Sequence, residues 1–210
     1  ELCFLDINAS HENRDIMLDV VRRTADQCFI PLTVGGGVKT IIDIKNLLRA
    51  GADKVSINTA AVKNPKLISD LVNIFGSSTV VVSIEAKYKS ENSWEVYIES
   101  GREKTGLNVS EWALKVNKLG AGEILLTSVD REGTGKGYDI KLIKSVTEKV
   151  NIPVVASGGM GKPEDLIDAI KEGKADAISM ADIIHYNKVH FDVIRQVALK
   201  NSIETRTLND

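Results

Sequence analysis

Short apolar runs alternate with amphipathic segments along the chain, and this alternation predicts its fold class. Seven runs rich in aliphatic residues predict buried strands at 2–5, 29–34, 54–57, 79–84, 123–127, 152–156 and 177–180. Seven segments with apolar residues at helical spacing predict helices at 15–27, 40–51, 65–76, 110–119, 139–150, 163–172 and 191–200. Strands that are apolar throughout are typical of parallel sheets covered on both faces. The pattern therefore predicts an α/β protein built from βα units.

One stretch interrupts the alternation. Residues 88–100 contain the alternating segment Trp-Glu-Val-Tyr-Ile at 94–98. Polar and apolar residues in strict alternation are typical of a strand with one exposed face. We expect a small hairpin here, outside the regular succession of strands and helices.

The chain also repeats itself. Residues 31–38 read Pro-Leu-Thr-Val-Gly-Gly-Gly-Val, and residues 153–160, 122 positions later, read Pro-Val-Val-Ala-Ser-Gly-Gly-Met. Fourteen residues beyond each glycine pair come Gly51-Ala52-Asp53 and Gly173-Lys174-Ala175-Asp176, each followed by a short apolar run. A repeat of strand, glycine loop, helix and strand at a fixed offset indicates a fold made of two similar halves.

Two architectures fit a succession of parallel βα units, a doubly wound sheet and a (β/α)₈ barrel. A doubly wound sheet has one dominant phosphate loop near its switch point. Two equivalent glycine loops at half-chain spacing favour a TIM barrel with a two-fold half-barrel repeat, since both loops then lie on one rim. Seven strands are one fewer than the barrel needs, so we expect residues 1–210 to be a single barrel domain that lacks its first βα unit.

The amino-acid composition limits the kinds of partner that this chain is expected to bind. The 210 residues carry a net charge of −2 and are 43% hydrophobic. This near balance of charge argues against nucleic-acid and membrane partners. With no apolar run near 20 residues, we expect a soluble cytoplasmic protein. The two cysteines form no CxxC motif and His185 and His190 have no ligand spacing, so neither a metal nor a cofactor is expected.

The glycine loops at 35–37 and 157–159 follow predicted strands and precede predicted helices. Glycine there lets backbone N–H groups approach an anion at a helix amino end. The alternative is a pair of tight turns that merely require positive φ. Two loops in register favour phosphate binding, and thus a substrate with a phosphate at each end.

Carboxylates follow three of the predicted strands. Asp6, Glu85 and Asp130 all stand at strand carboxyl ends, where barrel active sites lie. Carboxyl groups there suit general acid and base chemistry. Each one taken alone could equally be a helix cap or a solvated loop residue.

Five motifs give the chain a specific resemblance. It resembles the cyclase subunit of imidazole glycerol phosphate synthase over essentially its whole length, through Phe-Leu-Asp-Ile-Asn-Ala-Ser at 4–10, Thr-Val-Gly-Gly-Gly at 33–37, Gly-Ala-Asp-Lys-Val-Ser-Ile-Asn-Thr-Ala-Ala at 51–61, Gly-Ala-Gly-Glu-Ile-Leu-Leu-Thr-Ser at 120–128 and Ala-Ser-Gly-Gly at 156–159. The resemblance implies a (β/α)₈ barrel that takes ammonia from a glutaminase subunit docked at its amino-terminal face.

The resemblance also implies a reaction and a set of site residues. Ammonia crosses the barrel and converts a bis-phosphorylated formimino ribulosyl aminoimidazole carboxamide ribonucleotide into imidazole glycerol phosphate and aminoimidazole carboxamide ribonucleotide. One substrate phosphate is expected at Gly37, Asn58 and Thr59, and the other at Gly133, Gly159 and Ala181. The ammonia gate and tunnel are expected at Glu1, Lys54, Glu123, Thr33 and Ser56. The glutaminase contact is expected at Asp53, and the catalytic position at Glu85.

Three residues depart from the family pattern on the expected catalytic rim. Glu85 stands where the family has a catalytic aspartate, Glu132 where it usually has Asp, and Asp182 where a serine usually meets phosphate. A carboxylate shifted by one C–C bond is costly, because a misplacement of roughly 1 Å can reduce a rate by ~10²-fold. The first-strand aspartate and the following lysine are not in the sequence.

These departures leave three hypotheses open. The chain is the histidine-pathway cyclase, or a paralogue that pairs with a glutaminase to form acetamidino groups on surface-polysaccharide sugars, or a non-catalytic incomplete barrel that binds phosphates or a partner. The gate and tunnel motifs favour the first two, and the three rim changes favour the second.

Overall fold

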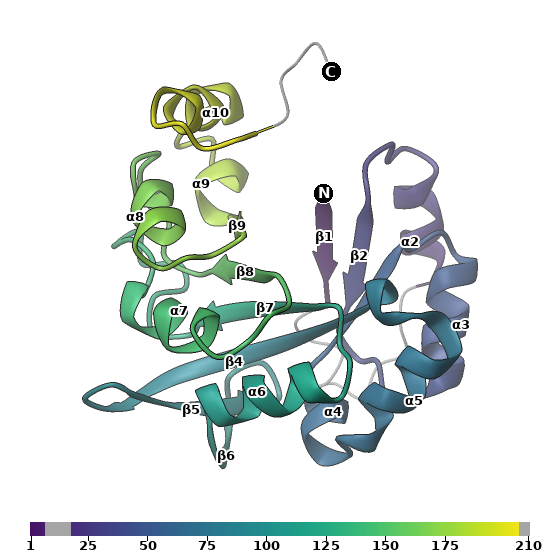
Figure 1. Ribbon diagram of the computed structural model, residues 1–210. Helices are drawn as coiled ribbons and strands as arrows, with labels where there is room; N and C mark the ends of the chain where they lie inside the picture. The colour runs from purple at the N-terminus through teal and green to yellow at the C-terminus, as the bar shows by residue number, and fades with distance from the viewer. Residues whose placement is uncertain (7–17, 206–210) are drawn as a thin grey trace.

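Seven parallel strands form the curled sheet at the centre of this protein (Figure 1). The computed structural model describes residues 1–6 and 18–205, so residues 7–10 of the first motif and 15–17 of the first expected helix lie outside the described residues. The strands pair in the order β1 (Leu2–Leu5), β2 (Leu32–Gly35), β3 (Lys54–Ile57), β4 (Val80–Ser90), β7 (Glu123–Ser128), β8 (Val154–Ser157) and β9 (Ala177–Ser179).

Helices cover the outside of this curl (Figure 1). They are α2 (Leu18–Ala25), α3 (Ile41–Arg49), α4 (Thr59–Lys63), α5 (Lys66–Phe75), the 3₁₀ turn η1 (Ser77–Thr79), α6 (Val109–Lys118), α7 (Ile140–Thr147), α8 (Asp165–Lys171), α9 (Asp182–His185) and α10 (Phe191–Lys200). Their inward residues, such as Leu47 and Leu71, are fully buried in one cluster with strand residues such as Ile84 and Leu126. The alternation predicted from the sequence is confirmed.

Local sequence explains most element boundaries. Thr40 caps α3 through a capping box with Asp43, as its position predicts. The helix expected at 110–119 begins one residue earlier, at Val109, because the Asn108 side chain accepts Ser110 N–H and Glu111 N–H. The expected strand at 29–34 begins only at Leu32, and Phe29 is 93% exposed.

The hairpin predicted at 94–98 is present and larger than expected. Strand β4 continues to Ser90 and pairs in antiparallel fashion with β5 (Ser93–Ile98), which in turn pairs in antiparallel fashion with β6 (Glu103–Asn108). The Trp94 indole N–H donates to the Asp139 carboxylate at 3.0 Å, and the same carboxylate caps α7 through Leu142 N–H. The hairpin is thereby tied to the second half of the sheet.

The two halves repeat in hydrogen bonding as well as in sequence. Cys3 aligns with Thr33 between β1 and β2, and at the same offset Leu125 aligns with Val155 between β7 and β8. At the start of β3, Asp53 accepts Leu32 N–H through its carboxylate at 2.8 Å and donates its own N–H to the Leu32 carbonyl at 2.9 Å. Asp176 does the same with Val154 at the start of β9, at 2.8 and 3.0 Å.

The sheet is open along the strand order. Strands β1 and β9 stand at its two ends, and within residues 1–6 and 18–205 neither pairs with a second parallel neighbour. On β1, Leu2 and Leu5 are 41% and 40% exposed. The structure therefore shows a curled, TIM-like α/β sheet. No described helix is both long and apolar enough to cross a membrane.

The repeated aspartates generate a stability prediction. We expect Asp53→Ala and Asp176→Ala each to lower the free energy of unfolding by about 1–2 kcal/mol, because each leaves a strand N–H without its charged acceptor. Urea unfolding of both variants measures this loss. Asp53→Asn and Asp176→Asn keep an acceptor oxygen and should lose less. An unchanged midpoint in either alanine variant would contradict a structural role for the repeat.

Candidate functional site

Two pockets lie at the carboxyl ends of the parallel strands. The first, the Glu85 pocket, is lined by residues from the ends of β1 to β4, among them Asp6, Gly37, Asn58, Thr59 and Glu85. The second, the Glu132 pocket, is lined by residues that follow β7, β8 and β9: Glu132, Gly133, Gly158, Gly159, Ala181 and Asp182. The structure thus brings each expected trio of phosphate residues into one pocket.

Glycine is required in both loops by close contact with the neighbouring strand end. Gly36 has φ +97°, and a Cβ built on it would lie 2.2 Å from the Asp6 carbonyl oxygen. Gly158 has φ +92°, and its Cβ would lie 2.7 Å from the Ser128 carbonyl oxygen. These loops are therefore turns that require positive φ, as the alternative interpretation holds. The same turns also line the pockets, so the two readings are compatible.

The side chains of Asn58 and Thr59 hold the hairpin. Asn58 Nδ2 donates to the Tyr97 carbonyl at 3.3 Å, and Thr59 Oγ1 accepts Glu99 N–H at 3.1 Å. Both residues line the Glu85 pocket, but these contacts already use a donor of one side chain and an acceptor of the other. Phosphate binding by Asn58 and Thr59 stays a prediction.

Glu85 lies where β4 passes the pocket. Its Oε2 accepts Gly101 N–H at 2.7 Å. Burial raises the pKa of Glu85 above its ordinary value, hydrogen bonds from Gly101 and Asn58 lower it, and the charge of Glu99 adds to the net rise. A carboxyl group with a raised pKa exchanges its proton nearer to neutral pH, which suits general acid and base chemistry.

Two carboxylates lie in the Glu132 pocket. Burial and the negative charge of Asp182 raise the pKa of Glu132, with Gly133 N–H opposing them. The Asp182 carboxylate in turn forms an ion pair with the Lys188 ammonium group. Lys188 thus neutralises the carboxylate that replaces the family's serine. A carboxylate beside a phosphate is unfavourable unless a cation intervenes, and Lys188, which sequence reasoning missed, is such a cation.

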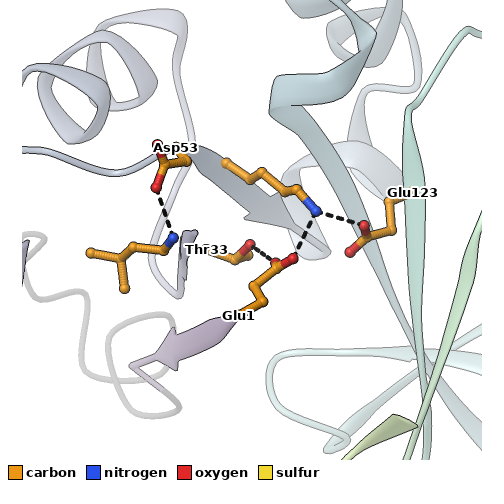
Figure 2. Close-up of polar contacts among 6 residues, drawn as sticks. Glu1, Thr33, Asp53 and Glu123 are labelled. Carbon is orange, nitrogen blue, oxygen red and sulfur yellow. Dashed lines mark hydrogen bonds and ion pairs between the residues drawn. The ribbon is translucent and has the colours of Figure 1, made fainter. Parts of the chain in front are cut away.

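The expected gate residues form one cluster at the amino edge of the sheet (Figure 2). Lys54 Nζ lies 2.9 Å from a Glu1 carboxylate oxygen and 2.8 Å from a Glu123 carboxylate oxygen. Burial alone would raise the pKa of Glu1, but hydrogen bonds from Thr33 and Lys54 outweigh it and leave the pKa lowered. Burial alone would lower the pKa of Lys54, but its interactions with Glu123 and Glu1 outweigh this effect and leave the pKa raised.

The two expected tunnel residues lie at different places, Thr33 beside Glu1 and Ser56 in the lining of the Glu85 pocket. The Thr33 hydroxyl donates to Glu1, and Thr33 is only 2% exposed. Ser56 is 4% exposed and lines the Glu85 pocket, while its neighbour Lys54 belongs to the cluster. Both side chains are therefore buried, and a tunnel that passes them stays a prediction.

Asp53 has a structural contact that the resemblance did not imply. Figure 2 shows its carboxylate directed at a backbone nitrogen, that of Leu32. The repeat-related Asp176 makes the same contact in the second half of the chain. A contact of Asp53 with a glutaminase stays a prediction.

Sequence reasoning missed the segment that follows β5. Residues 99–101, Glu-Ser-Gly, contact Thr59, Lys63 and Glu85, and Ser100 lines the Glu85 pocket. The only signal was the glycine after a strand whose alternation ends at Ile98. In the parts of the chain that the structure describes, no group of three or more His, Cys, Asp and Glu side chains is placed to hold a metal ion.

Similarity to known proteins shows the family of this chain. The family model described as "Histidine biosynthesis protein" matches residues 1–190. This chain belongs to that family. It is 51% identical over 206 residues to imidazole glycerol phosphate synthase subunit HisF of Alkaliphilus metalliredigens, covering 98% of this chain and 82% of the relative. The protein of that name from Methanocaldococcus jannaschii is 52% identical over 227 residues, covering 99% and 84%. The resemblance stated from the motifs is confirmed.

The cluster at the amino edge predicts a pH-dependent stability. Lys54→Met leaves two carboxylates without their shared cation, and we expect about 1–2 kcal/mol lower stability at pH 7, after allowance for partial exposure. Because the pKa of Glu1 is lowered in the folded state, its contribution is complete above its ordinary value of 4.5 and is lost as pH falls through the lowered value.

Urea unfolding at pH 7 and pH 3 measures this dependence. The difference between wild type and Lys54→Met should shrink at the lower pH. Lys144→Met, which breaks an exposed pair with Glu148 on one helix, serves as control and should cost under about 0.5 kcal/mol at both pH values. An equal loss for Lys54→Met at both pH values would contradict this account of the cluster.

Proposed function

We propose that this chain is the cyclase subunit of an imidazole glycerol phosphate synthase. The observation that carries the proposal is 51% identity to the HisF subunit of A. metalliredigens over 98% of this chain. The arrangement of the site supports it, since two glycine pockets lie at the carboxyl edge and one charged cluster lies at the amino edge. The cytoplasmic location expected from the sequence stays a prediction.

The proposed substrate is the bis-phosphorylated formimino ribulosyl aminoimidazole carboxamide ribonucleotide. One phosphate binds beside Gly37 in the Glu85 pocket, and the other beside Gly133, Gly159 and Ala181 in the Glu132 pocket. Positive-φ glycines leave room for phosphate oxygens next to backbone N–H groups. The products are imidazole glycerol phosphate and aminoimidazole carboxamide ribonucleotide.

Ammonia enters this scheme from a glutaminase subunit at the amino edge. The cluster of Glu1, Lys54 and Glu123 is the gate, and opening it requires Lys54 to leave at least one carboxylate. Thr33 and Ser56 offer hydroxyl groups along the buried path to the Glu85 pocket. Small polar side chains of this kind can accept and donate hydrogen bonds to ammonia as it passes.

Glu85 is the acid and base of the proposed reaction. Ring closure around the incoming nitrogen requires protons to leave that nitrogen and to reach the departing group. Burial raises the pKa of Glu85, which favours such exchange near neutral pH. Glu85 lines the same pocket as Gly37, so the carboxyl group lies near one bound phosphate end.

The proposal includes a closed eight-stranded barrel. Strands β1 and β9 are parallel to their neighbours and stand at the ends of the curled sheet. A further parallel strand between them would pair with both edges and cover Leu2 and Leu5. Such a βα unit would also bring the aspartate and lysine that the family resemblance implies.

A second candidate follows from the rim changes. Glu85, Glu132 and Asp182 all differ from the family pattern, and all line the two pockets. They favour an acceptor other than the histidine-pathway substrate, such as a sugar that receives an acetamidino group. The ammonia path is the same in both candidates. A non-catalytic barrel is the third outcome.

Ammonium-dependent turnover tests the proposal. The full-length protein carrying this chain is given the formimino ribulosyl substrate and ammonium salt, which removes the need for a glutaminase. We expect turnover of about 1 s⁻¹ or more. Glu85→Gln keeps the shape and removes the proton exchange, so kcat should fall by about 10²–10⁴-fold. Absence of turnover in a folded protein would contradict the histidine-pathway function.

Glu85→Asp separates the first two candidates. In a histidine-pathway cyclase the aspartate places the carboxylate where the family has it, so kcat should rise. In an enzyme adapted to another acceptor, the same change should leave turnover of the formimino ribulosyl substrate unchanged. Steady-state kcat of the two proteins measured side by side decides between them.

A further inference from the structure

Three consecutive residues with positive φ follow β5 beside the Glu85 pocket. Glu99, Ser100 and Gly101, which we name the strap, have φ values of +51°, +58° and +73°. Residues other than glycine rarely adopt this backbone conformation. Such a residue stays in it only when surrounding contacts fix its backbone. Two strained residues in succession therefore indicate that the strap is fixed by its neighbours.

Those neighbours are residues of the candidate site. Glu99 N–H donates to Thr59 Oγ1 at 3.1 Å, and the Glu99 carboxylate lies 3.1 Å from Lys63 Nζ. Gly101 N–H donates to Glu85 Oε2 at 2.7 Å. Ser100 lies between these contacts and lines the Glu85 pocket. The strap thus crosses the pocket from helix α4 to strand β4.

We propose that the strap is a positioning element for Glu85. Gly101 N–H holds the carboxyl group in its working orientation, and the Glu99–Lys63 ion pair with the Thr59 contact holds the strap in place. The inference rests on the proposed function, because it gives Glu85 the acid and base role. It also names the residues that allow a glutamate to replace the aspartate that the family has at this position.

The longer side chain explains why positioning is needed. Glutamate has one more rotatable bond than aspartate, so its carboxyl group samples more positions unless it is held. Gly101 supplies a backbone hydrogen bond to this carboxylate. The short Gly101 contact is of the charge-assisted kind, which is stronger than a neutral hydrogen bond.

The same hairpin contains a matched comparison. Gly106 also has positive φ, at +77°, and its N–H also donates to a glutamate, Glu95 Oε1, at 2.7 Å. This second pair lies on β5 and β6, away from the residues that line either pocket. It separates the structural effect of such a bond from an effect on Glu85.

Alanine at the two glycines tests the positioning role. A Cβ on Gly101 would lie 3.1 Å from Val129 Cγ1 and would strain the positive φ, so the amide shifts away from Glu85. We expect Gly101→Ala to lower kcat about tenfold with KM within twofold, because misplacement by a fraction of an ångström is costly. Gly106→Ala meets nothing within 4 Å and carries the same backbone strain, and it should keep the wild-type kcat. Equal kcat values for the two variants would overturn the proposal.

The pH dependence of turnover gives a second readout. The groups around Glu85 are Glu99 with its partner Lys63, Asp6 in the same pocket, and Lys87 on β4, which stacks over the Tyr97 ring at 4.7 Å. Gly101 N–H lowers the pKa of Glu85, so Gly101→Ala should move the Glu85-dependent limb of the kcat/KM profile to higher pH. Gly106→Ala disturbs the matched bond to Glu95 and should leave that limb in place.

Titration of Glu85 itself distinguishes this inference from the proposed function. The ¹³Cδ resonance of Glu85 is followed against pH in wild type, Gly101→Ala and Gly106→Ala, with no substrate present. A higher Glu85 pKa in Gly101→Ala alone supports the strap whether or not the protein turns over the proposed substrate. An identical Glu85 pKa in all three proteins overturns it.

Discussion

The site depends on a close approach of backbones at two strand ends. Gly36 passes the end of β1, and Gly158 passes the end of β7, so near that a single methyl group would meet a carbonyl oxygen at 2.2 and 2.7 Å. At these contacts the glycines have positive φ values, which direct each loop toward its pocket. Because the two contacts recur at one sequence offset, both pockets are formed by the same local geometry.

Charges are separated between the two edges of the sheet. At the amino edge, two carboxylates share one lysine, which lowers the pKa of Glu1 and raises that of Lys54. At the carboxyl edge, burial raises the pKa of Glu85 and Glu132. One edge therefore holds stable ion pairs that suit a gate, and the other holds carboxyl groups that exchange protons, which suits catalysis.

Much of this arrangement could be predicted from sequence because it follows from local patterns. The apolar runs, the glycine repeat and the carboxylates after strands predicted the parallel sheet, the two pockets and the position of Glu85. The strap could not be predicted, because its contacts with Thr59, Lys63 and Glu85 join residues distant in the chain. The pairing of Lys188 with Asp182 depends on the turn after α9.

Binding of inorganic phosphate tests the central claim most directly, because both pockets are proposed to hold one phosphate end of the substrate. Amide resonances of ¹⁵N-labelled protein are followed during titration with phosphate, with chloride at equal ionic strength as control. The account predicts saturable shifts at Gly36 and Gly37 and, independently, at Gly158 and Gly159. Saturable shifts confined to surface lysines, or none at either glycine pair, would contradict it.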